Sequence, residues 1–191
     1  MADPYMEEAL RLAAEAAAEG EVPVGCVIVR GEKIVGRGRN RRERAKNALA
    51  HAELEAIAQA CETLGGWRLW ECRLYVTLEP CPMCAGAIIN ARIPEVIYGA
   101  SDPKAGACGS VTDLFAMSFN HHPRLQKGME EERCAEALKA FFRTLREERA
   151  GARDQEQGAS SAIARKPVSA IEINPSRSDT TIITHYLLPI T

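Results

Sequence analysis

Two short runs bring together four side chains that suit a metal and its acid–base chemistry. The first is His-Ala-Glu at residues 51–53, and the second is Pro-Cys-Pro-Met-Cys at residues 80–84. Imidazole nitrogen and thiolate sulfur are the usual ligands of zinc, and a catalytic zinc site has three protein ligands and a fourth position open to water. His51, Cys81 and Cys84 therefore predict a zinc site. The fourth side chain, Glu53, is left for proton transfer.

The spacing of the second run has a physical reason. If a helix begins at Cys81, then Cys84 lies one turn further along the same face, and both sulfurs reach one ion. Pro82 favours such a start, because the first helical position needs no N–H and prefers the fixed φ of proline. A helix N-terminus also favours thiolates over thiols. His51 and Glu53 lie at the start of a second predicted helix, so two helix N-termini would face one ion.

Other interpretations of the same cysteines stay open. A Cys-x-x-Cys pair also occurs in redox sites, and a structural zinc site would need a fourth ligand, which Cys26, Cys72 or Cys108 could supply. None of these three belongs to a second Cys-x-x-Cys or His-x-x-x-His pair. The two runs together, H-x-E followed by P-C-x-x-C, form the known signature of zinc nucleobase deaminases. We therefore favour a catalytic site in which Glu53 is not a ligand.

Length and composition limit the class of protein. A chain of 191 residues suffices for one domain of ordinary size and a tail. No run approaches the roughly 18 apolar residues of a membrane span, and the acidic N-terminus is unlike a signal peptide. Seven cysteines with no disulfide-framework spacing indicate a reducing compartment. We expect a cytoplasmic protein with no membrane partner.

The overall charge does not mark a nucleic-acid binder, because the formal net charge is −2. Two local groups of basic side chains are nevertheless candidate phosphate contacts. They are Arg37, Arg39, Arg41, Arg42, Arg44 and Lys46 in one run, and Lys139, Arg143 and Arg146 on one helical stripe. The alternative is that each group is a solvated surface.

Hydrophobic periodicity predicts alternating helices and strands. Helices are expected over residues 6–18, 51–64, 81–91, 112–117 and 130–148, and strands over residues 22–30, 33–39, 73–78 and 95–100. The last two strands are separated by one helix, so they should be parallel neighbours with a right-handed crossover. Residues 120–123 read as a loop, where the adjacent His121 and His122 are a second, weaker metal candidate. Glu79 reads as structural because it precedes Pro80 at a strand end.

The composition changes after Arg149. Residues 150–191 are rich in Ser, Ala and Pro, show no helical period and contain one β-like run at 180–188. The predicted division is a zinc-dependent deaminase domain at residues 1–149 and a C-terminal tail at 150–191. The tail would be flexible, pair with a partner as a strand, or be a segment left by cloning.

Six runs resemble those of the bacterial tRNA-specific adenosine deaminases over about residues 4–149. They are VPVG at residues 22–25, HAE at 51–53, TLEPCPMCAGA at 77–87, GASDPK at 99–104, NH at 120–121 and FFR at 141–143. The resemblance implies an α/β fold of three layers (α/β/α), like cytidine deaminase, with a central mixed five-stranded sheet and helices on both faces. It places the fifth strand near residues 124–127. It also implies a homodimer with one zinc ion per subunit, acting on the tRNA anticodon stem-loop.

The resemblance further implies a role for each matching residue. His51, Cys81 and Cys84 would bind zinc, and Glu53 would be the general acid and base. Substrate-binding roles fall on Asn40 for the flipped base or its ribose, on Val24 and Pro80 for the pocket lining, and on Asp102, Lys104, Asn120 and Phe142 for the flanking nucleotides. The structural alternatives are turns for the asparagines and the core for Val24 and Phe142.

The expected reaction is hydrolytic deamination of the wobble adenosine to inosine, with release of ammonia. Zinc would activate a water molecule and Glu53 would shuttle its proton. Two other functions stay open. One is a zinc deaminase of a free base or nucleoside, such as guanine, cytosine or cytidine. The other is a non-catalytic, RNA-associated zinc-binding subunit, which would not need the Glu53 carboxylate for proton transfer.

Overall fold

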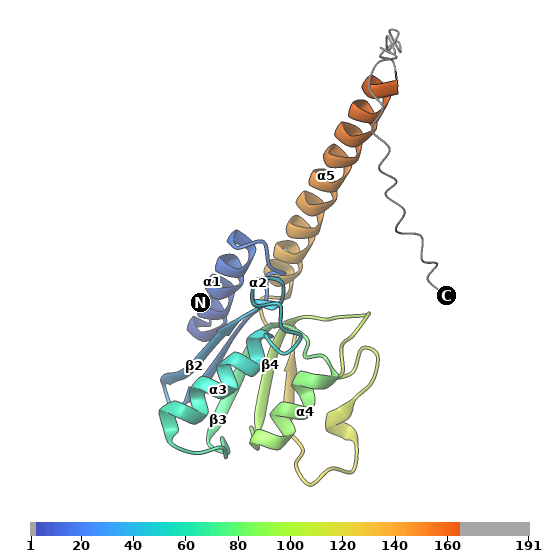
Figure 1. Cartoon of the computed structure of the whole chain (residues 1–191). Coiled ribbons are helices and arrows are strands. Elements are labelled where there is room, and N and C mark those ends of the chain that lie inside the picture. Colours follow the sequence, from blue (N-terminus) through green and yellow to red (C-terminus); the bar gives the residue numbers. More distant parts are fainter. Residues whose placement is uncertain (1–2, 165–191) are drawn as a thin grey trace, which may run out of the picture. The chain divides into compact units, whose positions relative to one another are not determined.

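A five-stranded mixed sheet forms the centre of the molecule (Figure 1). The computed structural model describes residues 3–164, with side chains described through residue 151. In chain order the elements are α1 (Pro4–Ala18), β1 (Gly25–Arg30), β2 (Lys33–Arg39), α2 (Arg42–Ala45), α3 (Ala52–Leu64), β3 (Cys72–Leu78), α4 (Pro82–Ala91), β4 (Glu95–Ala100), the 3-10 helix η1 (Leu114–Ala116), β5 (Arg124–Lys127) and α5 (Glu131–Ala164). The strand order is β2-β1-β3-β4-β5. β1 is antiparallel to β2 and β3, whereas β3, β4 and β5 are parallel.

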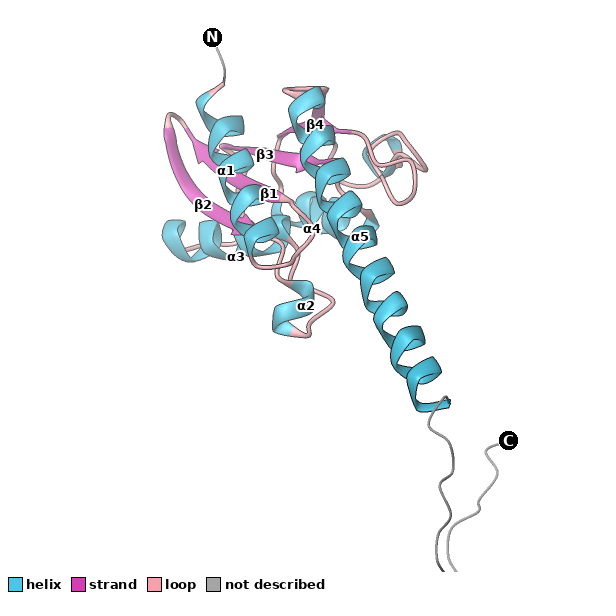
Figure 2. Ribbon diagram, turned by 90° about the horizontal axis from the view of Figure 1, so that it is seen from above, coloured by secondary structure: helices cyan, strands magenta, loops and turns pink. Residues whose placement is uncertain are grey.

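Helices cover both faces of the sheet (Figure 2). Successive side chains of a strand point to opposite faces. In β1, Cys26 and Ile28 accordingly pack with α3 and α4, whereas Val27 and Val29 pack with α1 and the start of α5. This confirms the predicted three-layer α/β/α fold, including a fifth strand at residues 124–127.

The connection between β3 and β4 positions the site. The two strands are parallel as predicted, and Leu78 at the end of β3 pairs with Ala100 at the end of β4. The carboxyl ends of both strands therefore meet at one edge of the sheet, where α/β folds bind ligands. The chain enters α4 directly after β3, and it enters the loop at residues 101–113 directly after β4.

Helix α3 lies against the backbone of β2 because two glycines leave room for it. A Cβ added at Gly36 would collide with the Ala56 carbonyl oxygen, and one added at Gly38 with that of Ala52. Ala52 is the first residue of α3. The two glycines therefore set the distance at which the start of α3, with His51 and Glu53, lies from the sheet.

Replacing Gly38 by alanine is expected to lower the free energy of unfolding by about 1–3 kcal/mol. The added Cβ would collide with the backbone of α3, which must move to make room, and not with a flexible side chain. Urea unfolding of the two proteins measures the difference. Gly66→Ala is the matched control, since a Cβ there meets nothing within 4 Å. Equal losses in both variants would contradict this account of the packing.

The structure departs from the predicted elements in several places. The first helix begins at Pro4 and not at residue 6, the first strand begins at Gly25 and not at residue 22, and the helix predicted at residues 112–117 is the 3-10 helix Leu114–Ala116. The short helix α2 lies in the basic run, where no helix was predicted. Helix α5 continues to Ala164, beyond the predicted end at residue 148. Ala, Arg, Gln and Glu after Arg149 favour the helix, and no proline interrupts it before Pro167. The description of residues 150–164 as tail without helical period was therefore wrong.

The β-like run at residues 180–188 lies outside the described residues, and the domain division after Arg149 stays a prediction. In residues 3–164, no helix combines the length and the apolar character needed to cross a membrane.

Candidate metal and catalytic site

The start of α3 and the start of α4 bring one imidazole and two thiols together. His51 is the N-cap of α3, Cys81 is the N-cap of α4, and Cys84 lies in the first turn of α4. The Nδ1 atom of His51 lies 3.8 Å from the Cys81 sulfur and 3.6 Å from the Cys84 sulfur. The three ligand atoms all lie within 4.8 Å of one another, the only such His, Cys, Asp or Glu group found in the described part of the chain.

These distances fit a tetrahedral zinc ion. Zinc–sulfur bonds of about 2.3 Å and zinc–nitrogen bonds of about 2.0 Å place neighbouring N and S ligands about 3.6 Å apart at the tetrahedral angle. The group contains three ligands, and Cys26, Cys72 and Cys108 do not join it. Within the described residues the arrangement thus has the ligand number of a catalytic site, without the fourth ligand of a structural one.

The two thiols are electrostatically distinct. The hydrogen bond from Cys84, aided by His51 and opposed by burial, lowers the pKa of Cys81 to about 4. The same hydrogen bond, together with burial and the nearby Glu53 charge, raises the pKa of Cys84. The hydrogen bond with Cys81 raises the pKa of His51. Of the two thiols, Cys81 therefore loses its proton more readily, and a metal ion that binds both thiolates would displace the proton of Cys84.

Glu53 lies in the first turn of α3 and is only 4% exposed. Burial raises the pKa of its carboxyl group to about 7, with a further contribution from the Cys81 charge. A group whose pKa lies near neutrality both accepts and releases a proton readily at pH 7. Glu53 therefore lies beside the metal-binding group with a pKa suited to proton transfer, and its catalytic role stays a prediction.

A cavity of about 250 Å³ opens beside these residues. Its lining comprises Val22, Val24, Asn40, Arg42, Glu43, His51, Ala52, Glu53, Leu78, Glu79, Cys81, Asp102 and Ala105. Val24, Asn40 and Asp102 thus lie where the sequence predicted. Pro80 is not among the lining residues: it is buried, and its carbonyl oxygen accepts a hydrogen bond from the Ala107 N–H. Its role in lining the pocket stays a prediction.

A second cavity of about 610 Å³ adjoins the first, and Val22, Leu78 and Asp102 line both. Lys104 and Phe142 line this second cavity, as do Lys139 and Arg146 of the predicted basic stripe. Asn120 lines neither cavity and is exposed in the loop between η1 and β5. The structure therefore places Lys104 and Phe142 next to the metal pocket, but it does not bring Asn120 to it.

The adjacent histidines of this loop serve the fold. Nε2 of His121 lies 2.8 Å from the Ile93 carbonyl oxygen, and Nδ1 of His122 lies 3.1 Å from the Phe115 carbonyl oxygen. Neither joins a metal-binding group within residues 3–151.

Glu79 anchors the loop that forms one wall of the pocket. Its carboxylate accepts hydrogen bonds from the backbone N–H groups of Asp102, Cys108 and Ser110, at 3.0–3.1 Å, and from the Ser110 hydroxyl. Burial opposes ionisation of Glu79, but these hydrogen bonds outweigh burial and lower its pKa. This agrees with the structural role inferred from its position before Pro80.

Glu79→Gln is expected to lower the free energy of unfolding at pH 7 by about 1–3 kcal/mol, because backbone donors lose a charged acceptor. A folded-state pKa below the unfolded value contributes stability at neutral pH that is lost as the pH falls through the folded pKa. The difference between the two proteins should therefore shrink below pH 4.5. Urea unfolding from pH 7 to pH 3 measures it, with the exposed Glu71→Gln as control. A difference independent of pH would contradict the prediction.

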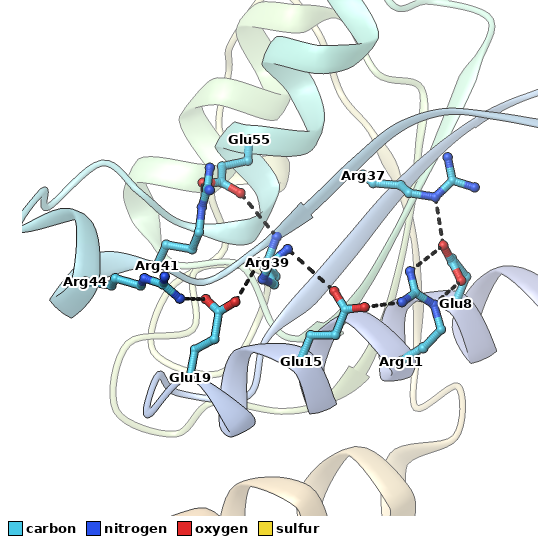
Figure 3. Close-up of polar contacts among 9 residues, drawn as sticks. All are labelled: Glu8, Arg11, Glu15, Glu19, Arg37, Arg39, Arg41, Arg44 and Glu55. Carbon is cyan, nitrogen blue, oxygen red and sulfur yellow. Dashed lines mark hydrogen bonds and ion pairs between the residues drawn. The ribbon is translucent and has the colours of Figure 1, made fainter.

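The basic run is largely paired with carboxylates (Figure 3). Arg37 contacts Glu8, Arg39 and Arg44 contact Glu19, and Arg41 contacts Glu55, at distances of 2.7–3.1 Å. The network in Figure 3 contains five arginines and four glutamates, which leaves a net charge of +1. Arg42 differs: it lines the pocket and contacts only Glu43, at 3.9 Å, among the described ion pairs. Phosphate binding by this run stays a prediction, and Arg42 is the member best placed for it.

Comparison with known proteins gives consistent matches. The model of the MafB19-like deaminase family matches residues 2–146. A tRNA-specific adenosine deaminase of Bacillus subtilis is 47% identical over 150 residues, which cover 78% of this chain and 93% of that protein. One from Streptococcus pyogenes serotype M18 is 44% identical over 144 residues, 75% and 91% of the two chains. A solved structure from a study of A-to-I editing by tRNA:A34 deaminases at the wobble position of transfer RNA has a TM-score of 0.68 and 45% identity, covering 70% of this chain and 98% of that one.

Proposed function

The chain belongs to the tRNA-specific adenosine deaminase family, and from this we propose that it converts the wobble adenosine of a tRNA anticodon to inosine with release of ammonia. The observation that carries the proposal is the buried Glu53 beside a three-ligand His and Cys group. The cavity they share is smaller than the roughly 300–1,000 Å³ of sites for drug-sized ligands, which suits a single flipped base.

Zinc is the proposed cofactor, with one ion per chain held by His51 Nδ1 and by the sulfurs of Cys81 and Cys84. When bound, zinc would lower the pKa of a water molecule to about 7 and so supply a nucleophile at neutral pH. The mixed imidazole and thiolate donor set and its spacing support zinc over magnesium or calcium, which prefer oxygen ligands.

Glu53 is the proposed proton carrier. It would pass one proton of the attacking water to the ring nitrogen beside the reacting carbon and the other to the amino group. The amino group then leaves as ammonia, the water oxygen stays as the carbonyl and the ring nitrogen keeps its proton. Because Glu53 is almost fully buried, bulk water competes poorly for these protons.

The target nucleotide would lie in the first cavity, and its neighbours would lie along the second. Asn40 would bind the base or its ribose and Val24 would pack against it, whereas Asp102, Lys104 and Phe142 would contact flanking nucleotides. Extrusion of a base costs least where it is already unstacked, as in an anticodon loop. The proposal also includes a homodimer and a cytoplasmic location, and it retains Asn120 as a contact to RNA outside the two cavities.

The test is substrate choice. Zinc-loaded protein is incubated with an anticodon stem-loop that carries adenosine at the wobble position and, in parallel, with free guanine, cytosine and cytidine, and products are identified by mass. We expect inosine from the stem-loop and no change in the small molecules. Turnover of a free base or nucleoside alone would overturn the RNA substrate, and a zinc-bound protein that turns over none would indicate a non-catalytic subunit.

A further inference from the structure

A third buried carboxylate, besides Glu53 and Glu79, is Glu21 in the segment between α1 and β1. It is 1% exposed and forms no ion pair with any residue from 3 to 151. Three N–H donors reach it instead: the side-chain amide of Asn40 at 3.2 Å, and the backbone N–H groups of Glu43 at 3.2 Å and Arg44 at 2.7 Å. Because a buried carboxylate needs hydrogen-bond donors, Glu21 holds Asn40, Glu43 and Arg44 in fixed positions relative to one another.

The contact with Glu21 decides which end of the Asn40 amide faces the pocket. A carboxylate only accepts hydrogen bonds, so the Asn40 NH₂ group must point toward Glu21. The Asn40 carbonyl oxygen then lies on the opposite side of the amide, and no described group donates to it. The backbone is fixed as well, because the Asn40 N–H donates to the Val24 carbonyl oxygen at 3.0 Å. Asn40 therefore offers the pocket an acceptor.

Glu21 also fixes the neighbouring wall of the pocket. Arg41, at the N-cap of α2, has no side-chain capping bond, and the N–H groups at the start of this four-residue helix need acceptors. Glu21 supplies them from a distant segment of the chain. Through these bonds it holds Arg42 and Glu43, which line the same pocket as Asn40.

We propose that Glu21 is a positioning residue of the deamination reaction, which turns the Asn40 carbonyl oxygen toward the bound nucleoside to accept a hydrogen bond from its amine or ribose hydroxyl. This inference rests on the proposed function. Glu21 does not itself line the pocket, so it acts through Asn40 and the start of α2.

A double-mutant cycle on Glu21 and Asn40 tests the proposal. Glu21→Gln places an NH₂ group against N–H donors whichever way its amide turns, against Asn40 and Glu43 or against Arg44, and should lower kcat/KM for the stem-loop on the order of a hundredfold. In an Asn40→Ala background the same change should cost less than about tenfold, because residues that act as a unit are not additive. Zinc content and thermal unfolding are measured for each variant. Glu19→Gln is the matched control, since Glu19 pairs with Arg39 and Arg44 away from the pocket.

The exchanged pair Glu21→Gln with Asn40→Asp keeps the test decisive if Glu21→Gln alone does not fold. In this pair the glutamine amide donates to the aspartate, and a carboxylate oxygen again faces the pocket, so kcat/KM should exceed that of Asn40→Asp alone at least tenfold.

A stem-loop with 2′-deoxyadenosine at the wobble position identifies which group of the nucleoside donates to Asn40. If the ribose hydroxyl is the donor, Asn40→Ala costs nothing with this substrate, and if the amine is the donor, the cost remains.

Failure of the inference is distinct from failure of the proposed function. If the unsubstituted protein forms no inosine, the function itself is overturned. If it forms inosine but Glu21→Gln is as active as Glu19→Gln, the positioning role is overturned. Equal losses from Glu21→Gln with and without Asn40→Ala, or no gain in the exchanged pair, would also overturn it.

Discussion

Replacing Glu53 by glutamine lowers the rate of inosine formation by about 10²–10⁴-fold and leaves bound zinc in place. Glutamine has nearly the same shape, but it cannot take a proton from water, and general acid–base catalysis typically contributes a factor of this size. Zinc should remain because the metal-binding group is His51, Cys81 and Cys84 and does not include Glu53. Single-turnover rates on the stem-loop and the zinc content of the purified protein measure both quantities.

The matched control for this variant is Glu55→Gln in the same turn of α3. Glu55 does not line the pocket, so its replacement weakens the ion pair with Arg41 and the 3.4 Å hydrogen bond from the Arg39 backbone N–H, both of which lie outside the metal-binding group. Activity of Glu53→Gln within tenfold of the unsubstituted protein would show that another group carries the proton. Loss of zinc in that variant would instead make Glu53 a ligand.

Replacing Cys84 by serine abolishes deamination and removes zinc. Cys84 is fully buried, and its sulfur lies 3.6 Å from His51 Nδ1. A side chain from an exposed position could therefore replace this sulfur as a ligand only if α4 moved. A site with two remaining ligands holds the ion far more weakly, and metal binding also stabilises the folded state. We expect less than one-tenth of the normal zinc content after dialysis, and a melting temperature that no longer falls when a chelator is added.

Cys61→Ser is the matched control for the Cys84 variant. Cys61 lies in α3, is partly exposed and belongs to no metal-binding group of the described residues. It should keep normal zinc content and activity. Retention of zinc by Cys84→Ser at the normal ratio would contradict a three-ligand site and would direct attention to the buried Cys108 as a replacement ligand.

The parts of the fold that follow from local pattern could be predicted. β4 has the predicted bounds, and the parallel pairing of β3 with β4 followed from the single helix between them. The position of β5 was implied by the family resemblance and not by a local pattern. The helix starts at His51 and Cys81 are visible as local signals, but their meeting at one site was predicted from the signature that the two runs form together.

The parts that were missed depend on distant residues. Helix α2 is stabilised by Glu21, which is some twenty residues away and has no recognisable signal of its own beside Val22 and Pro23. The arginines of the basic run find their carboxylates on α1 and α3 (Figure 3), and no local pattern reveals such pairing.

The measurement that tests the central claim most directly is the position of inosine in a stem-loop with two adenosines, one at the wobble position and one elsewhere in the loop. Zinc-loaded protein is incubated with this RNA, and the products are fragmented and sequenced by mass. The account predicts inosine at the wobble adenosine alone, and none with Glu53→Gln under the same conditions. Inosine at neither position, or at both to the same extent, would contradict a wobble-specific adenosine deaminase.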